Sequence, residues 1–410
     1  MAKVITTELQ HSGASAANIT LDSSKNVTAE NNLTVDGNLA VTGTTNLTGT
    51  VTLPAGTTSD TLSFRRLNIN GDMTVAQRAT SVNLSGNNNS QNAVRVTDRF
   101  YLQNRSDANW TYSQESDGPP GFAKSFKALC TSADSSVAAN VYEMFSYKWE
   151  GRDLQQLKKG TSSAESITVS FWVKSNKTGT YILEAHDLDN SRQISQSYTI
   201  SSSATWEKKT ITFAGDTTGA LDNDNAASFQ LYWWVAAGSD KSSGTLNTSW
   251  GSITQANRAA GQVQLTDTTN NYWQITGIQV EVGTTATEFE HRPYADELLR
   301  CKRYCWVYSG EEWATFFLGI VASSTTWEGQ AMLPVTMRAK PSVTYSGNFR
   351  MWDGTALGTV SATGVASSSS FDSQMWLTAT CSGASFTAGN VAMFSASNDA
   401  SAKITFDAEI

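Results

Sequence analysis

A six-residue repeat between residues 32 and 56 constrains this chain more than any other feature. The units NLTVDG, NLAVTG and TTNLTG end at Gly37, Gly43 and Gly49. Each unit alternates apolar and polar residues and then turns at glycine, which predicts a short strand followed by a turn. A few such strands from one chain cannot enclose a dry core, because repeat units bury their apolar faces against neighbours. The repeat therefore predicts that other chains complete the fold.

We predict that residues 18–60 form a stalk in which three parallel copies of the chain wind about one axis. Residues 1–17 precede it as a flexible or docked arm. A Thr/Gly-rich linker without fixed structure is the alternative, since its composition would look similar. The predicted core of the trimeric stalk consists of Leu33, Val35, Leu39, Val41, Leu47, Val51 and Leu53.

Composition favours a β-protein and excludes some classes of partner. Only 16% of the 410 residues are charged, and Ser, Thr, Asn and Gly are abundant. The net charge of -8 and the lack of a Lys/Arg run argue against nucleic acid as a partner. Since neither a signal peptide nor a bilayer-length apolar stretch is recognisable, we expect a soluble protein made in a cytoplasm, without membrane insertion.

Residues 61–292 have the pattern of a β-sandwich. Strand candidates, from SITVSFWVKS (166–175) to YWQITGIQVEVG (272–283), are separated by clusters of Ser, Thr, Asn, Asp and Gly. Many short antiparallel strands in this length predict a jelly roll. The apolar phase of the last strand switches at Gly277, which predicts a bulge.

The rest of the chain reads as one helix followed by more strands. Pro293 suits a helix start, and acidic then basic residues follow it, which predicts a connecting helix over 293–306. Strand patterns return over 307–410, where we predict a second, smaller β-sandwich. The fold class is therefore all-β.

Several motifs resemble those of bacteriophage tail-fibre and related virion proteins over roughly residues 67–306. They include LNINGDMTVAQR, GFAKSFKALC, EGRDLQQLKKGT, SITVSFWVKSNKTGTY, TWEKKTITFAGDTTGA and YWQITGIQVEVGTTATEFEHRPYADELLRCKRYCW. The N-terminal arm with its repeats is similar to virion proteins of phages of marine bacteria, cyanophages in particular.

The resemblance implies a homotrimeric fibre located in the virion and synthesised in the cytoplasm of a bacterial host. It implies that residues 1–17 attach to other phage tail or virion proteins. It further implies a carbohydrate-binding-module-like jelly roll, a distal β-domain and recognition of a host-surface glycan or protein receptor. A head fibre or a structural protein decorating the tail fits the same parts, and a bacterial carbohydrate-binding subunit or adhesin would need an export signal.

A glycan binder needs flat aromatic faces flanked by groups that bond hydroxyls. Strand alternation sends Trp172, Tyr232 and Trp234 away from their neighbours' apolar face, so these three are the main candidates. Trp149 and Trp250 lie beside polar turn residues and are secondary candidates. All five could instead fill a second core layer or a trimer interface.

We do not expect an enzyme. Glycoside hydrolysis needs two carboxylates across a cleft, whereas Asp187 with Asp189, and Glu311 with Glu312, are sequence neighbours of the kind found in solvated turns. A tail-associated polysaccharide depolymerase is the catalytic alternative.

No cofactor is predicted. Asp222 and Asp224 in LDNDNAA supply oxygen ligands suited to a structural calcium ion, but an ordinary Asp/Asn turn explains them too. The four cysteines, in a chain with three histidines, are expected to be buried packing residues rather than zinc ligands or disulfides.

Overall fold

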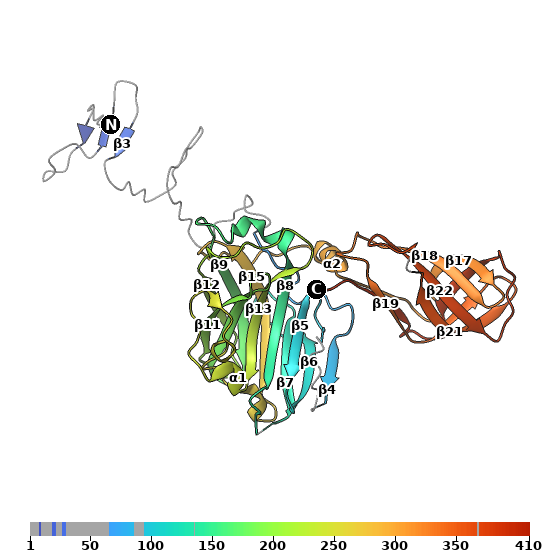
Figure 1. Cartoon of the computed structure of the whole chain (residues 1–410), viewed down its shortest axis with the longest axis horizontal. Helices are drawn as coiled ribbons and strands as arrows, with labels where there is room; N and C mark the ends of the chain where they lie inside the picture. The colour runs from blue at the N-terminus through green and yellow to red at the C-terminus, as the bar shows by residue number, and fades with distance from the viewer. Residues whose placement is uncertain are drawn as a thin grey trace, which may run out of the picture. The chain divides into compact units, whose positions relative to one another are not determined.

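The computed structural model divides the chain into two units, Met1–Thr57 and Thr58–Ile410. Within them the structure describes residues 8–9, 19–21, 27–29, 65–85, 94–134, 136–366 and 369–410. In this described part of the chain, strands dominate and helices are few and short (Figure 1).

The first unit contains a small antiparallel sheet of order β1-β2-β3. Its strands are β1 (Glu8–Leu9), β2 (Ile19–Leu21) and β3 (Val27–Ala29). The stalk core predicted from Leu33 to Leu53 lies outside the described residues. The trimeric stalk therefore stays a prediction.

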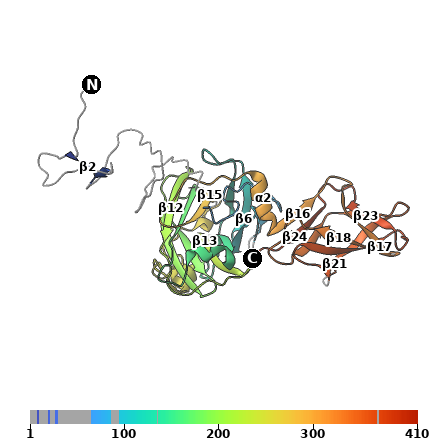
Figure 2. The same cartoon turned by 90° about the horizontal axis from the view of Figure 1, so that it is seen from above.

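Two six-stranded antiparallel sheets make up the sandwich of the second unit, which confirms the predicted β-sandwich in its coarse form (Figures 1 and 2). The first sheet has the order β14-β11-β10-β13-β8-β5. Its strands are β5 (Phe100–Arg105), β8 (Tyr142–Glu150), β10 (Gly179–Asp187), β11 (Arg192–Ile200), β13 (Ala227–Ala237) and β14 (Gly251–Ser252).

The second sheet has the order β12-β9-β15-β7-β6-β4. Its strands are β4 (Ser81–Leu84), β6 (Asn109–Glu115), β7 (Ser125–Ser132), β9 (Ile167–Ser175), β12 (Glu207–Phe213) and β15 (Tyr272–Val282).

Large aromatic side chains fill the space between the sheets. Phe145 of the first sheet contacts Phe126 and Trp273 of the second, with ring centroids 4.5 and 5.6 Å apart. Phe171 and Trp233 meet edge to face at 5.9 Å. Aromatic rings bury the most apolar area per residue, so these contacts hold the two layers together.

The predicted bulge at Gly277 is present. The pairing of β15 with β9 shifts register between Thr276 and Gln279, and Gly277 has a φ of 62°. This left-handed backbone conformation favours glycine, which has no Cβ to clash. The bulge lets Ile275 and Ile278 both face the core although they are three residues apart.

Short helices occupy the loops of the sandwich. They are η1 (Gly151–Leu157), α1 (Ser239–Ser242), η2 (Gln255–Asn257) and η3 (Leu265–Asp267). α1 and η2 belong to one long connection between β13 and β15, which bears on the functional site below.

The predicted connecting helix is shorter than expected. It is α2 (Tyr294–Lys302), preceded by Pro293, and Cys305 and Trp306 belong to the strand β16 instead. Glu297 of this helix is buried, where it accepts hydrogen bonds from the Arg66 side chain and the Asn70 backbone N–H. These bonds tie α2 to the chain that leads into the sandwich.

The C-terminal region is a barrel rather than the predicted second sandwich. Its strands close in the order β17-β18-β22-β21-β20-β23. They are β17 (Thr315–Ser323), β18 (Thr326–Met332), β20 (Phe349–Trp352), β21 (Leu357–Val365), β22 (Gln374–Ser382) and β23 (Val391–Ala396). A three-stranded sheet, β16-β24-β19, accompanies it, with β16 (Cys305–Ser309), β19 (Ser342–Ser346) and β24 (Lys403–Asp407).

Closure depends on pairings that alternation alone does not reveal. β17 pairs with β18 on one edge and with the distant β23 on the other. The paired Gly319 and Gly329 make room for the buried Trp327 indole, since a Cβ on either would lie within 2.6 Å of that ring. Sandwich and barrel strands have the same period of two, so the sequence pattern fits both.

Candidate functional site

The outer face of the second sheet is polar and aromatic. Residues 287–290 cover the part of it around Gln279 and Glu281, and we call the rest the open face. Alternation along β9 turns Val169, Phe171 and Val173 into the core. It therefore turns Trp172 and Lys174 outward, where both side chains are partly exposed.

A row of polar groups crosses the open face from strand to strand. Lys174 of β9 pairs with Gln274 of β15, Gln274 pairs with Lys127 of β7, and Lys127 pairs with Ser113 of β6. Trp206, just before β12, extends this row beyond β9, because the Lys174 ammonium lies 4.9 Å from its ring centroid. Directly paired residues on one face lie about 5 Å apart, so the row is continuous.

Asp117, from the loop between β6 and β7, ties this row together. Its carboxylate accepts hydrogen bonds from Lys174 Nζ, from Gln274 Nε2 (3.3 Å) and from Trp206 Nε1 (3.4 Å). Partial burial alone would raise the pKa of Asp117, but the bonds from Lys174 and Trp206 outweigh it and lower that pKa. The Asp117 side chain keeps 48% exposure, so a ligand can reach it.

Three further rings border the row. Tyr272 lies beside Lys127, whose ammonium is 5.0 Å from the ring centroid. Trp172 lies next to Gly277, where an added Cβ would be 3.1 Å from the indole and 2.8 Å from Phe122. The bulge glycine thus leaves room for Trp172 and Phe122 on the open face. All three rings are partly exposed.

The outer face of the first sheet, which we call the covered face, differs. Tyr232 and Trp234 do point away from the central core, as alternation predicts, and they form a separate apolar cluster with Met144 and Ile182. However, both rings are buried, with 6% and 0% exposure. Neither ring is therefore exposed to a ligand, in contrast to Trp172.

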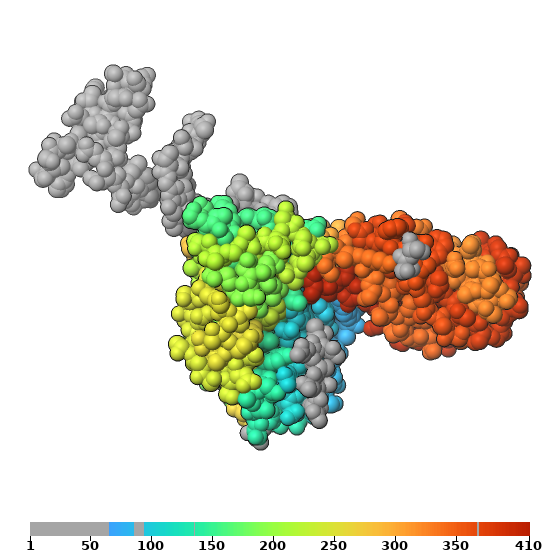
Figure 3. Space-filling model, viewed as in Figure 1, coloured from blue at the N-terminus to red at the C-terminus, as the bar shows by residue number. Residues whose placement is uncertain are grey.

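The cause is the long connection between β13 and β15, which covers this face. Ala259 and Leu246 of the connection belong to the same cluster as Trp234. In Figure 3 the connection forms the yellow part of the surface turned to the viewer. Arg258 inserts its guanidinium 5.3 Å from the Tyr232 ring and 5.2 Å from the Trp234 ring.

A buried ion pair fixes this cover. Arg258 Nε donates to Glu184 Oε1 at 2.8 Å, and Trp234 Nε1 donates to Glu184 Oε2 at 2.9 Å. Burial alone would lower the pKa of Arg258, but Glu184 outweighs it and raises that pKa. Burial lowers the pKa of the neighbouring His186 to about 4.

The secondary candidates both serve the core. Trp149 lies near the end of β8, just before η1, is 3% exposed, and donates from Nε1 to the Leu67 carbonyl at 3.0 Å. Trp250 packs on the central core from outside and donates to the Ala214 carbonyl at 2.7 Å. Trp172 is thus the one predicted glycan candidate on the open face.

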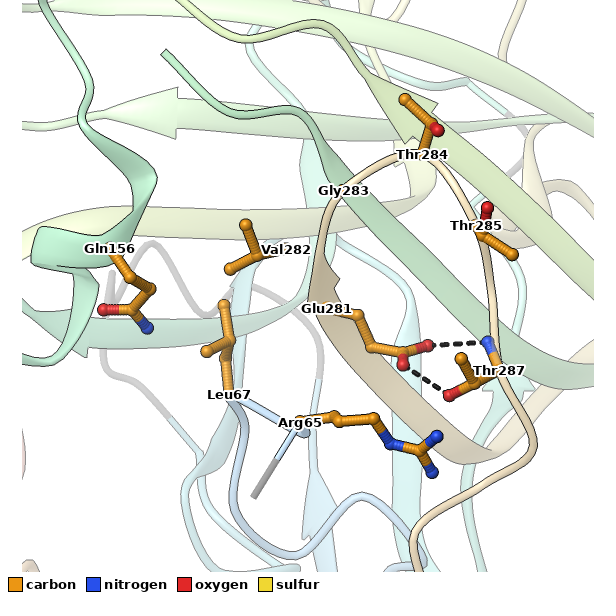
Figure 4. Close-up of a pocket in the computed structure, with 9 residues that line it drawn as sticks. All are labelled: Arg65, Leu67, Gln156, Glu281, Val282, Gly283, Thr284, Thr285 and Thr287. Atoms are coloured by element: carbon orange, nitrogen blue, oxygen red, sulfur yellow. Dashed lines mark hydrogen bonds between the residues drawn. The ribbon is translucent and has the colours of Figure 1, made fainter. Parts of the chain in front are cut away.

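A pocket of about 470 Å³ lies beside the end of β15 (Figure 4). Thr287 donates a hydrogen bond to each carboxylate oxygen of Glu281, one from its backbone N–H (3.0 Å) and one from its hydroxyl (2.5 Å). Arg65 and Gln156 supply further polar groups, and none of the lining residues is aromatic. The pocket therefore lacks the ring platform that the open face offers.

The acidic candidates have structural partners. Asp187 is buried and accepts hydrogen bonds from Lys159 and Asn190, while Asp189 accepts one from the Asp222 backbone N–H. Asp224 Oδ1 accepts from the Ala226 N–H at 2.8 Å, as in an ordinary turn. Among the described residues no group of three or more His, Cys, Asp or Glu side chains could hold a metal ion. Cys130, Cys301, Cys305 and Cys381 are buried free thiols, as predicted.

Sequence reasoning missed Trp206, Tyr272, Asp117 and Gln274. Alternation could have found Trp206, because it lies an even number of residues from the outward Lys208 and an odd number from the core residue Ile211. Asp117 sits in a loop, and no periodicity places a loop over a sheet.

No helix in the described part of the chain is long and apolar enough to cross a membrane. No protein-family model matches the sequence, and no curated protein matches it. Solved structures show a distant similarity to carbohydrate-binding modules and to a phage tailspike domain.

One such structure is the enzymatically active domain of bacteriophage CBA120 tailspike protein 4. It is 12% identical with a TM-score of 0.28, over 53% of this chain and 21% of that one. Another is the family 11 carbohydrate-binding module of the cellulosomal cellulase Lic26A-Cel5E of Clostridium thermocellum, at 13% identity and a TM-score of 0.25, over 50% and 99%. A third, TmCBM61 in complex with β-1,4-galactotriose, is 6% identical with a TM-score of 0.22, over 53% and 99%.

Proposed function

We propose that the protein binds carbohydrate through the open face. The observation that carries this proposal is the group formed by Trp206, Lys174 and Asp117, which joins an aromatic ring to a cation and a carboxylate on one partly exposed surface. The buried Gln274 amide donates to the Asp117 carboxylate and helps to hold it in place. The proposal names the chemistry of the ligand and leaves the sugar to experiment.

Each group matches a part of a sugar. A pyranose ring has an apolar face of C–H groups that stacks on an indole, and Trp206 and Trp172 supply such surfaces. Hydroxyl groups around the ring need both donors and acceptors, and Lys174 and Asp117 supply them. Because Asp117 already holds these partners in place, the site is ordered before a ligand arrives.

We further propose that the protein is a homotrimeric tail fibre of a phage virion and uses this face to adsorb to host-surface glycan without cutting it. The repeat of residues 32–56 and the resemblance of residues 67–306 to tail-fibre proteins support this role. Sugar contacts are individually weak, and linked copies raise avidity by about 10²- to 10⁴-fold where geometry allows. Labelling the protein in purified virions by immunoelectron microscopy tests its location.

Binding of the full chain to a broad glycan array, followed by calorimetry on any sugar found, tests the binding site. We expect Trp206→Ala to weaken binding about tenfold or more, equivalent to about 1.4 kcal/mol. Trp376→Ala is the matched control, because this partly exposed tryptophan of β22 in the barrel lies outside the open face. Equal affinities of Trp206→Ala and the unaltered chain would refute the assignment, and a chain that binds no glycan would refute the proposal itself.

A further inference from the structure

The C-terminal barrel has one apolar outer side. Leu318 of β17 pairs with Met393 of β23, Met393 pairs with Trp352 of β20, and Trp352 pairs with Leu357 of β21. The pair Ile320 and Val391 continues this row on β17 and β23. We define the apolar side by these residues: Leu318, Ile320, Trp352, Leu357, Val391 and Met393.

These side chains are exposed and adjacent. Leu318, Ile320, Trp352, Leu357 and Val391 have between 43% and 65% of their surface exposed. Direct cross-strand partners lie about 5 Å apart, so the side chains form one continuous surface. Single exposed apolar residues are ordinary, whereas contiguous apolar patches mark interaction sites.

The outer side formed by β18 and β22 is more polar, although Met332 at the end of β18 is exposed as well. Glu328 of β18 pairs directly with Ile320 and so lies at the edge of the apolar side. β18 and β22 turn Glu328, Gln330 and Thr380 outward, and Trp376 Nε1 donates to Glu328 Oε2 at 3.2 Å. The barrel already has its own core, in which Trp327 stacks on Phe394 at 5.1 Å. The apolar side is therefore surplus to folding of the barrel.

We propose that a second copy of this chain covers the apolar side. The patch exposes on the order of 500 Å² of apolar surface, most of the roughly 800 Å² that each partner contributes to a standard interface. None of its six residues is charged, so two copies can meet there without burying an unpaired charge. Equivalent patches that meet around one symmetry axis give a closed assembly, which is compatible with the three copies proposed above.

Polar residues border the patch in the way an interface rim requires. Arg350, two residues before Trp352 on β20, places its guanidinium 4.4 Å from the ring centroid of Trp313. Interfaces combine a dry apolar centre with a polar rim, and arginine and tryptophan are enriched in them. This inference rests on the self-association in the proposed function but not on its glycan site.

Thiol labelling of the full chain tests the contact. Ile320→Cys places a thiol in the patch at a position that is 48% exposed in one chain, and the four native cysteines are buried. Thr380→Cys on the polar side is the matched control, since that residue is also exposed. We expect a maleimide to react at least about tenfold more slowly with Cys at position 320 than at position 380.

A second substitution separates protection by another copy from slow intrinsic reactivity. Leu357→Asp lies on β21, away from Ile320 on β17, yet within the same patch. It should restore fast labelling in the Ile320→Cys background, because a buried unpaired charge disrupts the contact. Labelling of Ile320→Cys as fast as the control overturns the inference. If light scattering still shows an oligomer in that case, self-association stands and only its assignment to the apolar side fails.

Discussion

Each outer face of the sandwich carries a carboxylate that is hydrogen-bonded to a cationic side chain and to a tryptophan indole. One of these groups is buried and the other is partly exposed. On the covered face, Glu184 accepts from Arg258 and the Trp234 indole. On the open face, Asp117 accepts from Lys174 and the Trp206 indole. Each cation also lies about 5 Å from its tryptophan ring, at 5.2 and 4.9 Å.

The two faces differ in the chain segment that packs over them. The connection between β13 and β15 buries Glu184 completely, whereas the Asp117 side chain keeps 48% exposure. A buried ion pair is costly to break, since removal of one partner leaves the other charge buried without a partner or solvent. An exposed pair costs little to break and remains available to a ligand. The same side-chain chemistry therefore stabilises a lid on one face and offers a binding surface on the other.

The largest expected effect comes from removing the two carboxylates in turn. Glu184→Ala should lower the free energy of unfolding by about 3–5 kcal/mol, because Arg258 stays buried without its partner. Asp117→Ala should lower it by less than about 1 kcal/mol, as for other exposed pairs. Urea denaturation of both variants measures the difference, and equal losses would show that the two faces are not distinct in this way.

Acid should destabilise the covered face before the open one. The pKa of His186 falls from its usual value to about 4 through burial, with Arg258 and Lys148 lowering it and Glu184 raising it. Its neutral form is favoured in the fold, so its contribution is complete above about pH 6.5 and declines by up to about 3 kcal/mol as the pH falls to 4.

The measurement is stability against pH for the unaltered chain and for His186→Gln. The substituted chain should lose less stability between pH 6.5 and 4, because it has no imidazole to protonate. Parallel curves for the two chains would show that His186 is not responsible.

The smallest effect on stability concerns the aromatic surface of the open face. Trp206 is partly exposed, so Trp206→Ala should change the free energy of unfolding by less than about 1 kcal/mol while it weakens glycan binding. Thermal unfolding beside calorimetric titration separates the two properties. A large drop in stability would mean that Trp206 serves the fold and not a ligand.

Period-two alternation predicted much of the sandwich and the direction of its side chains. It placed Phe171 and Trp233 in the core, sent Trp172 and Trp234 away from it, and indicated the bulge at Gly277. These properties depend on residues close together in the chain, and the sequence displays them directly.

The glycan candidates show that alternation does not predict which outward side chains are exposed. Trp172 and Trp234 have the same pattern, yet one lies on an open surface and the other under Arg258 and Ala259. Asp117 reaches Lys174 and Gln274 from a loop, across 57 and 157 positions of sequence. The closing of the barrel likewise depends on the pairing of β17 with β23.

The sequence by itself determined most of the strands of the sandwich and which way their side chains point. Only the tertiary structure decided which of the two outward faces stays open, which tryptophan a ligand can reach and whether the C-terminal strands close into a barrel. The physical reason is that alternation is set by the backbone of one strand. Exposure depends on which distant segment packs on top, and the free energy of that packing is shared among residues far apart in the chain.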